Sequence, residues 1–139
     1  MAWFTDIEEA TVKNRLWRDV LFTGKHLQVV LMSVPSRQEL GWERHSKTDQ
    51  FFRVDSDPKS RGLIQLGHRR RRKNGNMEMV VDEEIDLYDG VAVVVPAGRW
   101  HNVINESGKY RLNFYTIYAP PHHAANRVDR TKADERKKK

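Results

Sequence analysis

The fold of this chain is predicted by residues 90–105, which read Gly90-Val-Ala-Val-Val-Val-Pro96-Ala-Gly98-Arg-Trp-His101-Asn-Val-Ile-Asn105. The apolar run over residues 91–95 predicts a short buried strand. Pro96 ends that strand because it has no N–H to donate to a ladder, and Gly98 permits the tight turn that follows. A second strand then carries three residues on one face, His101, Val103 and Asn105. The stretch therefore delivers one imidazole to the start of a strand through a rigid Pro-x-Gly corner.

The spacing of this stretch, G-x5-P-x-G-x2-H-x3-N, resembles the second signature motif of the cupin family, with every defining position filled. The resemblance implies an all-β fold, a double-stranded β-helix (jelly-roll, or cupin barrel) with a metal in its mouth. Two further segments, residues 41–54 and 115–121, resemble a small single-domain subfamily described as mannose-6-phosphate-isomerase-like. Because cupins include isomerases, dioxygenases and inert binders, this resemblance implies a fold and names no single reaction.

The first cupin motif, usually G-x5-H-x-H-x3–4-E-x6-G, aligns with residues 37–57 in altered form. His45 matches the motif outright. Glu43 stands where the first histidine would be, and Gln50 stands where the glutamate would be. Arg37 and Asp57 replace the opening and closing glycines. The carboxylate has therefore changed places within the motif, from position 50 to position 43.

The resemblance implies a metal site made by Glu43, His45, Gln50 and His101. Two imidazoles and a carboxylate suit Fe, Mn, Ni, Co or Zn as a divalent cofactor. Because a neutral amide oxygen is a poor ligand, we expect Gln50 to contribute less than the other three residues. The alternative is a cupin without metal, in which Glu43 and His45 hydrogen-bond in a polar barrel mouth. Two histidines at matching motif positions favour the metal.

With 139 residues and no cysteine, the chain is expected to form a single domain without disulfides or thiolate metal sites. The barrel is expected over about residues 20–120, followed by a charged tail over residues 121–139. Thr5 and Glu8 fit a capping box, which predicts a short N-terminal helix over residues 6–14. We expect a cytoplasmic protein because residues 1–6 lack the features of a signal peptide.

The pattern of apolar residues predicts several further strands and one mobile segment. Residues 41–45 are expected as a strand, and a turn over residues 46–49 then lets Gln50, Phe52 and Val54 face inward together. His122 and His123 are expected at the surface near the barrel rim, and residues 124–139 are polar and expected to be mobile. The remaining predicted strands cover residues 25–34, 63–66, 77–81 and 111–118.

A basic run gives the chain a second candidate function. The net charge is +6, and the tip of the hairpin predicted between residues 66 and 77 carries five basic residues, Arg69, Arg70, Arg71, Arg72 and Lys73. Such runs bind nucleic acid or other polyanions. Most charge blocks are solvated loops, however, and no aromatic residues alternate with these arginines as they do in single-strand platforms. A small-molecule site is therefore favoured over a polyanion site.

The favoured function is a metal-dependent enzyme, of the isomerase or dioxygenase type, acting on a small polar or carbohydrate-like molecule in the barrel mouth. The alternative is a non-catalytic binding protein of the same fold. Because antiparallel barrels must protect edge strands, we also expect a homodimer, with an apolar patch formed by Trp3, Phe4 and Trp17. Residues that could line the substrate pocket are Phe52, Trp100, Asn105 and Tyr115.

Overall fold

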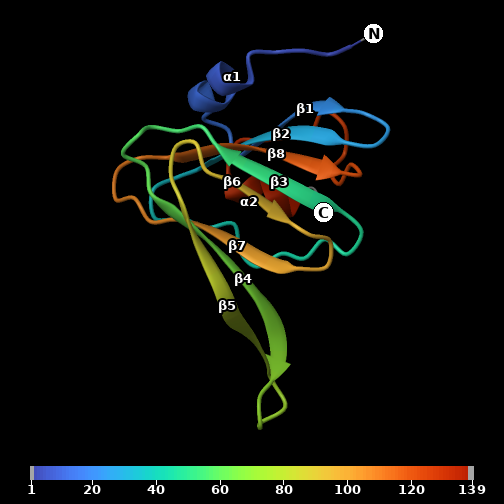
Figure 1. The fold of residues 1–139 in the computed structure, drawn as a ribbon, viewed down its shortest axis with the longest axis vertical. Coiled ribbons are helices and arrows are strands. Elements are labelled where there is room, and N and C mark those ends of the chain that lie inside the picture. Colours follow the sequence, from blue (N-terminus) through green and yellow to red (C-terminus); the bar gives the residue numbers. More distant parts are fainter. Residues whose placement is uncertain (1, 138–139) are drawn as a thin grey trace.

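The computed structural model of the chain describes residues 2–137 and contains two antiparallel sheets (Figure 1). The six-stranded sheet has the order β6 (Ala92–Val95), β3 (Asp49–Val54), β8 (Leu112–Ala119), β2 (Gln28–Val34), β1 (Arg18–Thr23) and β9 (Val128–Asp129). The three-stranded sheet has the order β5 (Met77–Leu87), β4 (Gly62–Arg71) and β7 (Trp100–Asn105). This arrangement confirms the predicted all-β jelly-roll.

The core lies between the two sheets, where alternate residues of each strand meet. Ile64 and Val103 of the smaller sheet are 0% exposed, as is Val30 of the larger sheet. Phe52 and Phe114 pack with ring centres 5.5 Å apart. Complete burial of such a side chain stabilises the fold by about 1.5–3 kcal/mol.

One strand of each motif tests the predicted burial. Gln50, Phe52 and Val54 of β3 are all buried, which confirms that they face inward together. The apolar run at residues 91–95 was expected to be wholly buried, and this is wrong. Val94 is 62% exposed, because β6 is an edge strand with only alternate side chains in the core.

The N-terminal helix α1 (Ile7–Lys13) is present, but it begins one residue later than the predicted capping box. Asp6 is the N-cap, and its carboxylate accepts a hydrogen bond from the backbone N–H of Glu9 at 3.1 Å. An aspartate is as effective a cap as threonine or better, and its oxygen satisfies one of the free N–H groups of the first turn.

Two predicted strand boundaries are wrong. The strand expected over residues 25–34 begins at Gln28, and the strand before it, β1, was not predicted. Residues 24–27 form the turn between the two strands, and the N–H of Gly24 closes it by donating to the Leu27 carbonyl at 2.8 Å. Residues 41–45 do not form a strand, because only Glu43 makes a bridge there. The turn expected after His45 is present.

The β4–β5 hairpin projects from the barrel and is longer than predicted (Figure 1). The basic run was placed at its tip, but residues 69–71 belong to β4, and the turn covers residues 72–76. The ladder has a bulge at Leu66 and Gly67, and beyond it both strands resume regular pairing. Glu78 pairs with Arg70 at 2.7 Å and with Arg72 at 2.8 Å, so part of the basic charge is neutralised within the hairpin.

The C-terminal segment packs against the barrel through residues 128–135, so the expectation that it is mobile is wrong for these residues. β9 pairs with β1, and α2 (Lys132–Lys137) follows. Arg18, with its side chain 3% exposed, donates to Asp129 at 2.9 Å. Trp17 Nε1 donates to Glu135 at 2.8 Å. Residues 138–139 lie outside the described part.

Trp17 does not belong to an exposed apolar patch as expected, because it is 1% exposed in the core. Of its proposed companions, Trp3 is 40% exposed and stacks on Phe22 with ring centres 5.3 Å apart. Phe4 is 90% exposed. No helix among the described residues is long and apolar enough to cross a membrane.

Candidate metal centre

Glu43 and His101 are held side by side by the backbone. The N–H of Glu43 donates to the carbonyl of His101 at 2.9 Å, and the N–H of His101 donates to the carbonyl of Glu43 at 3.0 Å. Residues that exchange both bonds are directly opposite each other, so their side chains lie on the same face. The first and second motifs therefore meet at this bridge.

The Pro-x-Gly corner positions His45. Gly98 has φ +87°, a conformation that favours glycine, and its N–H donates to the carbonyl of His45 at 2.8 Å. His45 is 8% exposed, and its ring centre is 5.4 Å from that of His101. The turn predicted from sequence thus holds the histidine of the other motif.

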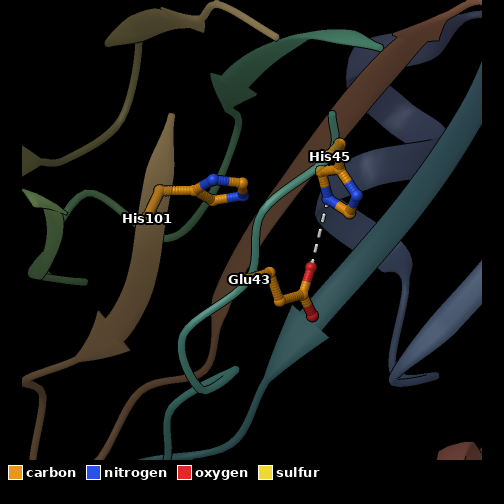
Figure 2. A group of neighbouring side chains, drawn as sticks. All are labelled: Glu43, His45 and His101. Atoms are coloured by element: carbon orange, nitrogen blue, oxygen red, sulfur yellow. Dashed lines mark ion pairs between the residues drawn. The ribbon is translucent and has the colours of Figure 1, made fainter. Parts of the chain in front are cut away.

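The side chains of Glu43, His45 and His101 point into a common space (Figure 2), and their ligand atoms all lie within 4.8 Å of one another. Glu43 Oε2 is 3.3 Å from His45 Nε2. That contact lacks hydrogen-bond geometry, and Nε2 of both His45 and His101 is buried without a hydrogen-bond partner. Buried polar atoms are rarely left unpaired, so two unpaired nitrogens beside a carboxylate fit a cation.

The protonation states suit metal binding. His101 Nδ1 lies 3.2 Å from the carbonyl of Arg99, which makes Nδ1 the donor and leaves the lone pair on Nε2. Burial lowers the pKa of His101 and keeps the imidazole neutral. Burial would raise the pKa of Glu43, but the adjacent His45 and the guanidinium of Arg18 outweigh this effect, so the pKa of Glu43 is lowered. Neutral imidazoles and an ionised carboxylate are the forms that bind metals.

Gln50 lies on β3 with its side chain directed into the barrel. Its Nε2 donates to Thr116 Oγ1 at 3.0 Å, while Oε1 is buried without a hydrogen-bond partner. The amide therefore has a free oxygen, but its orientation is fixed by Thr116. Gln50 stays a weaker candidate ligand than Glu43.

The site opens into a cavity of about 560 Å³. Trp42, Arg44 and Trp100 line it from the barrel, together with Glu43 and His45. The C-terminal segment contributes the other lining residues, His122, His123, Ala124, Arg127 and Glu135, and β1 contributes Arg18. The tail that was expected to be mobile is therefore part of the site.

The predicted pocket residues divide into two groups. Trp100 lines the cavity, and the Phe52 ring packs at 5.9 Å against that of His101. Asn105 is not at the cavity, because its side chain is fully committed to the backbone of Val34, Tyr110 and Ser107. Tyr115 lies on the outer face of the six-stranded sheet beside Phe51, because alternation along β8 turns Tyr118 inward.

The polyanion candidates, Arg69, Arg70, Arg71, Arg72 and Lys73, lie on the projecting hairpin, and none of them lines the cavity. Arg69 lies over the Trp100 ring with its guanidinium carbon 5.6 Å from the ring centre. This contact ties the base of the hairpin to the wall of the cavity.

Sequence reasoning missed the aromatic and imidazole groups that close the site. Tyr118 is buried, and its ring packs 5.6 Å from that of His45. His123 was placed at the surface, but it is half-buried 3.3 Å from the Tyr118 hydroxyl, and burial beside Arg18 and Arg127 lowers its pKa to about 2. The adjacent histidines directly after the last predicted strand were the available signal.

Comparisons with known proteins agree with this architecture. The chain is 42% identical over 129 residues to uncharacterized protein YrkC of Bacillus subtilis, covering 93% of this chain. It spans 63% of the length of YrkC. The crystal structure of BH2720 from Bacillus halodurans has 39% identity and a TM-score of 0.83, covering 99% of this chain and 95% of that one. No family model matches the chain.

More distant structures share the fold. A cupin superfamily protein of Desulfitobacterium hafniense has 17% identity and a TM-score of 0.56, covering 78% of this chain and 80% of that one. Oxalate decarboxylase of Bacillus subtilis, which has Mn(II) centres, has 18% identity and a TM-score of 0.53 over 72% of this chain and 23% of its own. With both motifs meeting at the barrel mouth, the chain shares the double-stranded β-helix fold of these cupin structures.

Proposed function

We propose that Glu43, His45 and His101 hold a divalent metal and that the protein is a metal-dependent enzyme acting on a small polar molecule. One observation carries the proposal: two buried imidazole nitrogens without hydrogen-bond partners converge with a carboxylate within 4.8 Å. A divalent cation would satisfy all three groups at once, and the ligand set suits Fe, Mn, Ni, Co or Zn.

The metal-free alternative is less consistent with this geometry. Each buried polar group left without a partner costs about 1–3 kcal/mol. A barrel selected only for stability would place apolar residues at these positions, or partners in hydrogen-bond geometry. The fixed tautomer of His101 is also what a ligand requires, since its free nitrogen faces the other two side chains.

The metal would act as a Lewis acid on an oxygen of the bound substrate. The chain's own residues supply the rest of the site. Trp42 and Trp100 give the cavity apolar walls, and Arg44 adds a positive charge at the rim, where its Nε donates to the Gly98 carbonyl at 3.1 Å. A cavity of about 560 Å³ with these walls suits a small polar or carbohydrate-like molecule.

The test is metal analysis of the purified protein beside two variants, followed by turnover assays on a panel of sugars, sugar phosphates and small carboxylates. Wild-type protein and His26→Ala, which changes an exposed histidine away from the cavity, should hold about one metal per chain. His101→Ala should hold far less. Equal metal content in His101→Ala and wild type would overturn the assignment. Metal binding without turnover on any substrate would favour the non-catalytic binding protein.

A further inference from the structure

His122 lies beside the proposed metal centre although it comes from the C-terminal segment. Its ring centre is 4.2 Å from that of His45, with the planes at 63°. It also lines the cavity into which Glu43 opens. A residue outside both cupin motifs therefore lies against a ligand candidate.

The backbone at His122 is anchored by a buried glutamine. Gln28 is 0% exposed, and its Oε1 accepts hydrogen bonds from the N–H groups of His122 at 3.1 Å and His123 at 2.9 Å. Its Nε2 donates to the His123 carbonyl at 2.8 Å and to Thr23 Oγ1 at 2.9 Å. The amide is thus fully used in holding the histidine pair against β2. Such a saturated buried group rigidifies what it binds.

The two histidines differ in what their rings do. The His123 ring contacts the Tyr118 hydroxyl, whereas in the described part of the chain no hydrogen bond engages the His122 ring. The His122 side chain is exposed to the cavity, so it can change rotamer at small cost. His122 is therefore an anchored residue with an unused imidazole.

The ring separations fit shared ligation. Two imidazoles bound to one ion at about 2.0–2.1 Å have ring centres roughly 4–5.5 Å apart, depending on the angle between the two bonds. His122 and His101 lie 4.2 Å and 5.4 Å from the ring of His45. The converging group of ligand atoms is Glu43, His45 and His101, so His122 must rotate its side chain to join it.

We propose that His122, from the C-terminal segment, completes the metal centre as a fourth protein ligand. It takes the place of the residue at position 50, which offers only the neutral amide of Gln50. This rests on the proposed metal site. It gives the site three imidazoles and one carboxylate, although only two of the histidines lie in the cupin motifs. The C-terminal segment then serves to close the metal centre.

The test is titration of the metal-free full-length protein with Co²⁺, following the visible absorption bands that report the ligand set. His122→Phe keeps an aromatic ring against His45 but removes both nitrogens. It should weaken Co²⁺ binding by at least about tenfold, because loss of a residue that only hydrogen-bonds a ligand already weakens metal binding by that factor. It should also change the shape and intensity of the bands. His26→Ala should match wild type in both respects.

Two outcomes distinguish the proposed role of His122 from the proposed metal site of Glu43, His45 and His101. If His122→Phe and His122→Ala bind Co²⁺ with the wild-type dissociation constant and spectrum while His101→Ala does not, His122 is not a ligand and the three-residue site stands. If wild-type protein fails to bind Co²⁺, the metal site itself is overturned, and the role of His122 with it. Thermal melts of each variant confirm that the fold is kept.

Discussion

Glu43 and His101 face each other across a bridge made by two backbone hydrogen bonds of 2.9 and 3.0 Å. Because the backbone fixes their separation, the side chain at position 43 points at the same space whether it is histidine or glutamate. The exchange of a carboxylate between positions 50 and 43 is therefore compatible with an unchanged barrel, and it can be tested by reversing it.

Glu43→Gln should strip metal from the protein, because two neutral imidazoles need an anionic oxygen to hold a divalent ion well. Gln50→Ala should lower occupancy much less, since its amide is oriented by Thr116 and carries no charge. Metal content per chain after dialysis against a weak chelator measures both effects.

The double variant Glu43→His with Gln50→Glu rebuilds the usual cupin ligand set and should bind metal again. Full occupancy in Glu43→Gln together with loss in His101→Ala would show that Glu43 is not a ligand. Unchanged occupancy in every single variant would place any metal elsewhere.

The metal-free protein should lose stability as pH falls below about 6.5, the ordinary pKa of histidine. Burial lowers the pKa of His101, and that of His123 to about 2, so the unfolded chain binds protons at a higher pH than the folded one. The free energy of unfolding therefore decreases as pH falls. The lowered pKa of Glu43 also decreases the free energy of unfolding as pH falls, below the ordinary glutamate pKa of 4.5.

Melting temperatures in the presence of a chelator, from about pH 7.5 to about pH 5.5, measure this slope. His123→Gln should flatten the profile, because it removes a neutral imidazole that faces Arg18 and Arg127. A melting temperature that stays constant over this interval would contradict the expected burial of these histidines.

Asp129→Asn should destabilise the protein strongly. Asp129 is buried, accepts a hydrogen bond from Arg18 at 2.9 Å and lies 3.1 Å from Arg127 Nε. Removing one partner of a buried pair costs about 3–5 kcal/mol. Glu135, 3.3 Å from Arg18, offsets part of that loss. Chemical denaturation measures the loss. Glu9→Gln, which breaks an exposed helix pair with Lys13, is the control and should leave the midpoint unchanged.

Shortening the projecting hairpin should leave the barrel intact. In the present register Arg69 pairs with Met79, so an Asn-Gly turn in place of residues 70–78 keeps the remaining ladder. The removed ion pairs are exposed and contribute little to stability. A fall in melting temperature above about 10 °C would show that the hairpin is packed. Loss of salt-dependent heparin binding would assign polyanion binding to this arm.

We expect the protein to be a homodimer. Val94 is 62% exposed on the edge strand β6, and Phe4 is 90% exposed, so apolar surface remains uncovered in one chain. Light scattering of wild type, Val94→Lys and Phe4→Ser measures the mass. A wild-type monomer at micromolar concentration would contradict the expectation. Deletion of residues 1–18 is unsuitable, because Trp17 is part of the core.

The sequence was most informative where local rules apply. Pro96 and Gly98 fixed a corner by their backbone preferences, and alternation placed Gln50, Phe52 and Val54 on one face. The resemblance to the cupin motifs implied the barrel and four candidate ligands, and the ligand atoms of three of them, Glu43, His45 and His101, lie within 4.8 Å of one another. The mannose-6-phosphate-isomerase-like subtype stays a prediction, as does the single-domain boundary.

By itself, the sequence determined the Pro96–Gly98 corner and the inward face of β3, because turns and strand alternation are local properties of the chain. The resemblance of its two motifs to those of cupins implied the barrel and the candidate ligands Glu43, His45, Gln50 and His101. Only the tertiary structure decided that His122 and His123 face the same cavity. They reach it because β9 pairs with β1 and because buried Gln28 binds their backbone from more than 90 residues away. Such contacts depend on long-range pairing and charge burial, which leave no periodic pattern in a polar segment.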